Sequence, residues 1–220
     1  MRRARPRAAN DDRDPLRATP AGHGQPGACG GAQAARAEAS AQLAAYAPAD
    51  GAQGARRDDL AAFVDEHPDA LERTCRPGHL TGSALVVHAD GERLAVLHHA
   101  KLDRWLQPGG HADGDGNLAH VAWREATEET GIVGLVVLRP AIDIDVHEVA
   151  PPSEEPHLHL DVRFVVLAPP DAALVGNDES HDLRWVLPQE LPALGADEGL
   201  LRLARRGLPV ARGALRRLSW

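Results

Sequence analysis

The stretch that decides the fold is GHADGDGNLAHVAWREATEETGI, residues Gly110–Ile132. Asn117 belongs to the residue types that cap a helix at its N-terminus, because its side chain can accept a bond from a free backbone N–H group. Gly131 can end a helix in the left-handed conformation that other residues resist. The spacing between these two residues predicts a helix over residues 118–130.

The acidic side chains of this predicted helix share its apolar side. At roughly 100° per residue, one side carries the small and aliphatic residues Leu118, Val121, Ala122 and Ala126. Glu125, Glu128 and Glu129 fall within the same arc of roughly 160°. The opposite side already has polar residues for solvent, namely His120, Arg124 and Thr127.

A bound cation explains this arrangement better than a solvated helix face does. Glu125 and Glu129 form a like-charge pair four residues apart, which is worth a few tenths of a kcal/mol of repulsion. Acids near a helix C-terminus also oppose the helix dipole. Hard divalent ions such as Mg²⁺ prefer carboxylate oxygens and are completed by waters and substrate phosphates. We therefore expect Mg²⁺ or Mn²⁺ beside these glutamates.

Composition limits the class of protein. The chain has 220 residues, a net charge of −8 and a pI near 5.8, which disfavours a nucleic acid or an anionic membrane surface as partner. Its two cysteines, Cys29 and Cys75, form no zinc-finger spacing and no disulfide framework. No apolar run approaches the ~20 residues of a membrane span, and no signal peptide is evident. The sequence favours a cytoplasmic location.

The pattern along the chain predicts one domain with an N-terminal extension. Residues 1–38 contain Leu16 as their only large aliphatic residue, so we expect a disordered extension. Residues 39–78 show helical periodicity and are expected to pack on the domain, which spans residues 79–220. Asp90-Gly91 lies between two apolar runs and predicts a hairpin. Irregular alternation of strands and few helices predicts an α/β (α+β) fold, a mixed sheet between helices.

A second polar pattern lies in IDIDVHE and HLHLDVRF, residues 142–148 and 157–164. Period-2 alternation places on one strand face the polar residues Asp143, Asp145, His147, His157, His159, Asp161 and Arg163. If residues 149–156 form a hairpin loop, these two polar faces lie side by side. Three interpretations remain open: a solvated face, a lining for a substrate cleft, and a nitrogen-rich second metal site.

Residues 110–132 resemble the Nudix box, G-x5-E-x7-R-E-U-x-E-E-x-G-U, where U is a bulky aliphatic residue. The matching residues are Gly110, Arg124, Glu125, Glu128, Glu129, Gly131 and Ile132. The preceding WLQPGG also resembles the family. Two positions depart from the pattern: Ala126 is smaller than usual, and Gly116 replaces the first glutamate. Asp115, one residue earlier, is a candidate replacement.

The resemblance, which extends from Leu80 to about Leu194, implies a Nudix fold and a metal-dependent hydrolase. Family members cleave a diphosphate by attack of water on phosphorus. The implied metal ligands are Glu125, Glu128, Glu129 and Gly110, and the implied catalytic residues are Glu128, Glu129, Arg124 and Glu179. Glu179 precedes a Trp in ESHDLRWVLPQEL and is equally readable as an ordinary loop acid. The general base is left open among Glu128, Glu129 and Glu179.

Substrate contacts are expected from His111, His157, His159 and Asp161. The implied substrate is a small-molecule diphosphate: ADP-ribose or another nucleotide sugar, a nucleoside triphosphate or a dinucleoside polyphosphate. The sequence itself is silent on oligomeric state, although family members are often homodimers. Two rivals remain, a Nudix-like isoprenoid diphosphate isomerase and a non-catalytic ligand-binding module. The isomerase's Cys-x-His-Pro motif is absent, and DGDGN fails as a calcium loop because Leu118 and Arg124 occupy ligand-loop positions that need Gly and Glu.

Overall fold

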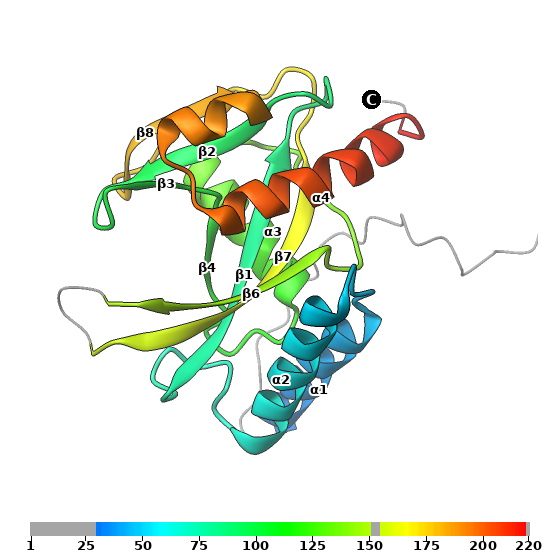
Figure 1. Ribbon diagram of the computed structural model, residues 1–220, viewed down its shortest axis with the longest axis vertical. Coiled ribbons are helices and arrows are strands. Elements are labelled where there is room, and N and C mark those ends of the chain that lie inside the picture. Colours follow the sequence, from blue (N-terminus) through cyan, green and yellow to red (C-terminus); the bar gives the residue numbers. More distant parts are fainter. Residues whose placement is uncertain (1–29, 151–154, 219–220) are drawn as a thin grey trace, which may run out of the picture.

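The computed structural model describes residues 30–150 and 155–218 (Figure 1). The helices are α1 (Gly30–Ala45), α2 (Gly51–Glu66), α3 (Leu118–Thr130) and α4 (Glu198–Leu215), with a 3-10 helix η1 (Pro188–Leu194). The strands are β1 (Gly78–Val87), β2 (Leu94–His99), β3 (Arg104–Leu106), β4 (Gly109–His111), β5 (Val136–Val137), β6 (Asp143–Val149), β7 (His157–Leu167) and β8 (Ser180–Val186). The predicted mixed α/β fold is confirmed.

The sheet is built around β1. This strand runs parallel to β7 and antiparallel to β2 and β4, while β6 and β5 extend the sheet beyond β7. The turn at Asp90-Gly91 joins β1 to β2, as the sequence predicts, and Gly91 has a φ of 72° that suits a residue without a side chain. Strands β6 and β7 pair antiparallel, which is the arrangement that places their polar faces side by side.

Helices pack on both faces of the sheet because side chains of β1 alternate between them. Leu80, Ala84 and Val86 belong to the core beneath α1, α2 and α3, whereas Leu85 and Val87 belong to the core beneath α4. Figure 1 shows α4 lying across one face of β1 and β7, with α3 behind them. Each fully buried Leu or Phe in these layers contributes roughly 1.5–3 kcal/mol.

The N-terminal boundary differs from the sequence-based expectation. Residues 30–38, expected to be disordered, form the first half of α1, and residues 1–29 lie outside the described part of the chain. Alanine has the highest helix propensity, so a helix can form here without large aliphatic residues. Small side chains also allow close packing: a Cβ added at Gly116 would lie 2.7 Å from Ala35 Cα and closer still to the Ala35 carbonyl.

Within the described residues, none of the helices combines the length and the apolar character that crossing a membrane requires.

Candidate active site

The helix that carries the glutamates begins and ends where its sequence predicts. Asn117 Oδ1 accepts a hydrogen bond from His120 N at 3.0 Å, and Gly131 adopts the left-handed conformation with a φ of 65°. Helix α1 supports the same N-terminus, because Gln42 Nε2 donates to Asn117 Oδ1 and Gln42 Oε1 accepts from Ala119 N. The start of α3 is therefore fixed by its own cap and by α1.

Glu129 is a buried carboxylate directed at the loop before the helix. It is 6% exposed, and Gly109 N donates to its Oε2 at 3.0 Å. Burial raises the pKa of Glu129 to about 8, the bond from Gly109 opposes that rise, and the charges of Glu125, Glu179 and Glu128 add to it. Burial thus disfavours the ionised form of Glu129, which a nearby cation would stabilise.

Glu125 lies against the backbone of Gly110. A Cβ added at Gly110 would be 2.6 Å from both carboxylate oxygens of Glu125, so any other residue would displace this acid. Arg124 Nη1 lies 2.7 Å from Glu125 Oε1. Burial nevertheless raises the pKa of Glu125, because the nearby Arg124 offsets only part of the desolvation.

Arg124 connects three parts of the site. Besides Glu125, its Nη1 lies 3.7 Å from Glu128 Oε2, and its Nη2 donates to the His111 carbonyl at 2.9 Å. The guanidinium therefore curves from its side of the helix toward the acids. Arg124 thus holds both an acid and the β4 backbone in place.

Glu128 and Glu179 are the exposed acids of the cluster. The Glu128 side chain is 58% exposed, and Asn177 Nδ2 donates to its backbone carbonyl at 3.2 Å. Asn177 Oδ1 also accepts from Glu179 N, so one side chain ties the loop to α3. The charge of Glu179 contributes to the raised pKa of Glu125 and of Glu129. The fold thus brings Glu179 beside the three helix glutamates.

These donors suit a hard divalent ion. All side-chain donors at the cluster are carboxylate oxygens, and the glycine backbone of β4 lies in contact with one of them. Among residues 30–150 and 155–218, two groups bring three ligand atoms within 4.8 Å of one another: His79, His157 and His159, and separately His67, Asp69 and Cys75. The glutamate oxygens stand farther apart, as mutually repelling carboxylates do.

The glycine at position 116, where the Nudix box has a glutamate, has a structural cause. Gly116 is covered by α1, so the backbone around Ala35 occupies the space that a larger side chain would need. Asp115 is directed to the helix start, where its carboxylate lies 2.6 Å from His120 Nδ1 and accepts from Asn117 N at 2.8 Å. Both contacts direct the Asp115 carboxylate to the start of α3, so Asp115 does not take the place of the missing glutamate.

The polar face of the β6–β7 hairpin is not solvated, so that interpretation is wrong for most of its residues. Asp161 is 1% exposed and accepts from Thr81 Oγ1, Ser83 Oγ and Arg163 Nε. Asp143 is fully buried against Arg163 and two arginines of α4, Arg202 and Arg206. The sequence analysis missed these α4 partners, although RLARR at residues 202–206 is a basic run in a helix.

Histidines gather at the other end of the same face. The β1–β7 register pairs His79 with His159, and the His79 ring centroid lies 4.9 Å from that of His111 and 5.0 Å from that of His157. His79 was missed by the sequence analysis. The signal was available, because alternation in HLTGS places His79 on the face of Thr81 and Ser83.

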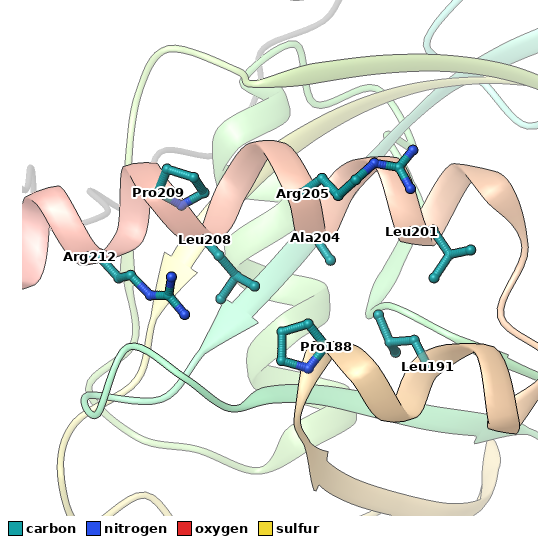
Figure 2. Close-up of a pocket in the computed structure, with 8 residues that line it drawn as sticks. All are labelled: Pro188, Leu191, Leu201, Ala204, Arg205, Leu208, Pro209 and Arg212. Atoms are coloured by element: carbon teal, nitrogen blue, oxygen red, sulfur yellow. The ribbon is translucent and has the colours of Figure 1, made fainter.

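A groove lies elsewhere, between η1 and α4, with a volume of about 440 Å³ (Figure 2). Leu201 and Leu208 of α4 point toward η1, and Leu191 of η1 points toward α4. None of the residues that line it belongs to the predicted site. The glutamate cluster, not this groove, holds the chemically reactive groups.

Comparisons with known proteins agree with this geometry. The family model described as NUDIX domain matches residues 78–206. Phosphatase NudJ of Escherichia coli strain K12 is 32% identical over 114 residues, which are 49% of this chain and 68% of the relative, and Phosphatase NudJ of Shigella flexneri gives the same values. An Ap4A hydrolase from C. elegans has a similar fold, with a TM-score of 0.50 at 14% identity over 61% of this chain and 98% of that chain. This chain therefore belongs to the NUDIX domain family and is a Nudix hydrolase.

Proposed function

We propose that the protein cleaves the phosphoanhydride bond of a nucleoside diphosphate derivative in a reaction that depends on Mg²⁺ or Mn²⁺. The substrate class comprises ADP-ribose and other nucleotide sugars, nucleoside triphosphates and dinucleoside polyphosphates. The observation that carries the proposal is the gathering of the Glu125 and Glu129 carboxylates against the glycine backbone of β4. Burial disfavours the negative charge of both acids there and so raises their pKa values. A divalent cation beside these acids would compensate that charge and leave positive charge for a diphosphate.

The residues of the cluster would have different roles in the reaction according to how exposed they are. Glu125, Glu128, Glu129 and the Gly110 carbonyl would hold the ion, which supplies charge neutralisation of the diphosphate and lowers the pKa of water. Arg124 acts as a positioning residue, since it holds Glu125 and the His111 carbonyl in place. A base must reach the attacking water, and Glu128 and Glu179 are the acids open to solvent, while Glu129 is already held by Gly109.

The position of Cys75 argues against the alternative function, an isoprenoid diphosphate isomerase. This thiol is 1% exposed, and burial together with the neighbouring Asp69 raises its pKa to about 11. A protonated, buried thiol is a poor acid–base or nucleophilic group near neutral pH. Cys75 also lies beside His67 and Asp69, outside the glutamate cluster. Hydrolysis therefore fits the arrangement better.

The test is phosphate release in a coupled phosphatase assay with Mg²⁺ or Mn²⁺ across the substrate classes above and coenzyme A. Glu128→Gln removes one site acid, and Glu66→Gln is its matched control because Glu66 is exposed at the end of α2. Turnover of one class that Glu128→Gln abolishes and Glu66→Gln retains supports the proposal. Folded, metal-binding protein that turns over none of these compounds refutes it.

A further inference from the structure

Three histidines from two neighbouring strands form a compact group away from the glutamates. His79 comes from β1, and His157 and His159 come from β7, with one nitrogen of each lying within 4.8 Å of those of the other two. His79 is fully buried and His157 is 3% exposed. The group lies on the α4 side of the sheet, because His79 alternates with Leu80, which faces the other core.

The histidines present nitrogen atoms that the protein itself does not use. Among residues 30–150 and 155–218, neither ring nitrogen of His79 has a partner at hydrogen-bond distance and angle, and neither does Nε2 of His159, although these atoms are buried. The Cys75 backbone lies close enough to His79 to act on its pKa. An unpartnered buried polar group costs roughly 1–3 kcal/mol, so such groups need an explanation. A cluster of them from different strands indicates that a ligand accounts for their positions.

His157 has the orientation of a metal ligand. Its Nδ1 lies 2.8 Å from the Glu155 carbonyl oxygen, and since a carbonyl only accepts, Nδ1 carries the proton. The lone pair then resides on Nε2. A ring whose other nitrogen donates to a carbonyl is the usual arrangement of metal-bound histidine.

His79 and His159 are also kept in the uncharged form that binds metals. Burial lowers the pKa of His79 to about 4 and that of His159 to about 2, and the neighbouring histidines lower both further. Neutral imidazoles do not repel a cation as imidazolium ions would. At neutral pH no proton has to leave these rings before an ion binds.

We propose that His79, His157 and His159 form a second metal site, for Zn²⁺ or a similar borderline divalent ion, distinct from the glutamate site. Imidazole nitrogen suits Zn²⁺, Cu²⁺ and Ni²⁺, whereas Mg²⁺ prefers oxygen. Ligands of a tetrahedral Zn²⁺ site lie about 3.3 Å apart, so the rings need only small rotations toward a common centre. Three protein ligands leave one position for water or for another group.

The site would be coupled to the Nudix loop through β4. The His111 ring lies 4.9 Å from His79 and 5.1 Å from His159, while the His111 carbonyl accepts from Arg124. An ion at the histidines therefore borders the strand that presents Gly109 and Gly110 to the glutamates. This position favours a structural role for the ion, holding β1, β7 and the neighbouring β4 together.

The test is metal binding by the full chain in excess Mg²⁺, which occupies oxygen sites. Metal-free protein is titrated with Zn²⁺ by calorimetry and with Co²⁺ by visible absorption, because Co²⁺ reports tetrahedral coordination. We expect one equivalent per chain, a thermal stabilisation that grows with Zn²⁺ concentration, and at least a ~100-fold weaker Kd in His157→Gln and in His159→Gln. His181→Gln is the matched control, because His181 is exposed and lies outside the group.

The outcomes separate this proposal from the proposed function. Equal Zn²⁺ affinity in the wild type, His157→Gln and His159→Gln would place the ion elsewhere and overturn the proposal. If both variants unfold, the wild-type spectrum decides, since the absence of a tetrahedral Co²⁺ band overturns the proposal as well. Neither readout involves turnover, so failure here leaves phosphoanhydride hydrolysis untouched.

Discussion

Two clusters of ionisable residues lie on opposite sides of one short strand. Gly110 of β4 contacts Glu125 on the side of α3, and its neighbour His111 packs against His79 and His159 on the other side. Successive side chains of a strand point to opposite faces, so the neighbours Gly110 and His111 face different clusters. Both clusters are largely buried, yet one is made of carboxylates and the other of imidazoles.

Burial acts on the two clusters in opposite directions. In each it disfavours the charged form, so it raises the pKa of Glu129 to about 8 and lowers that of His79 to about 4. The carboxylates offer oxygen ligands that a hard cation would hold in the ionised form, which favours such an ion. The imidazoles offer nitrogen lone pairs, which favours a borderline ion. Desolvation thus acts on both clusters, and the ligand atoms, oxygen in one and nitrogen in the other, set the ion that each would prefer.

Glu129→Gln tests the glutamate cluster and should give the largest effect on turnover. The amide cannot supply the second negative charge that a divalent ion needs, so we expect kcat to fall at least about 100-fold. Steady-state kinetics with Mg²⁺ measures it, with Glu66→Gln expected to stay within about twofold. Turnover of Glu129→Gln at the wild-type rate would remove Glu129 from the active site.

Gly116→Glu should disrupt the packing of α1 although it restores the residue typical of the Nudix box. The new side chain would overlap the backbone of Ala35, so we expect a loss of about 2–4 kcal/mol of unfolding free energy. For a chain of this size that lowers Tm by about 5–15 °C, measured by calorimetry. Gly54→Glu is the control, because an added Cβ there meets only Pro48 at 3.9 Å. An unchanged Tm in Gly116→Glu would contradict the docking of α1.

The pH dependence of stability should sharpen the contrast between the clusters. Because the folded pKa of Glu129 is about 8 and the unfolded value is about 4.3, the folded state binds more protons between these values. The unfolding free energy of metal-free protein therefore falls as pH rises from about 4.3 to about 8. Glu129→Gln lacks this decline.

Added Mg²⁺ should raise Tm more at pH 8 than at pH 5.5, because binding requires ionised carboxylates. Thermal scans in chelator and in Mg²⁺ at both pH values measure the effect. A Mg²⁺ response that is the same at both pH values, or that persists in Glu129→Gln, would show that the ion binds elsewhere.

Local signals in the sequence were sufficient for the glutamate helix. Asn117, Gly131 and the spacing of three glutamates depend on helix geometry within a few residues, and the structure confirms the helix over Leu118–Thr130. Asp143 shows what local signals miss: its partners Arg202 and Arg206 lie some sixty positions away on α4. The polar strand face, for which solvation was one of three open interpretations, is therefore buried there. The same limit applies to Gly116, whose neighbour Ala35 comes from a distant helix.

Glu179→Gln should give the smallest effect and separates a direct catalytic role from an electrostatic one. Glu179 is exposed, and its charge helps to raise the pKa of Glu129. Neutralising it should lower the Glu129 pKa, so the pH-dependent loss of metal-free stability ends at a lower pH and is smaller, and kcat should fall only about 3–10-fold. Asp178→Asn removes the adjacent exposed charge as a control. A loss of kcat as large as that of Glu129→Gln would instead identify Glu179 as the general base, because a group that acts only through neighbouring charge cannot produce it.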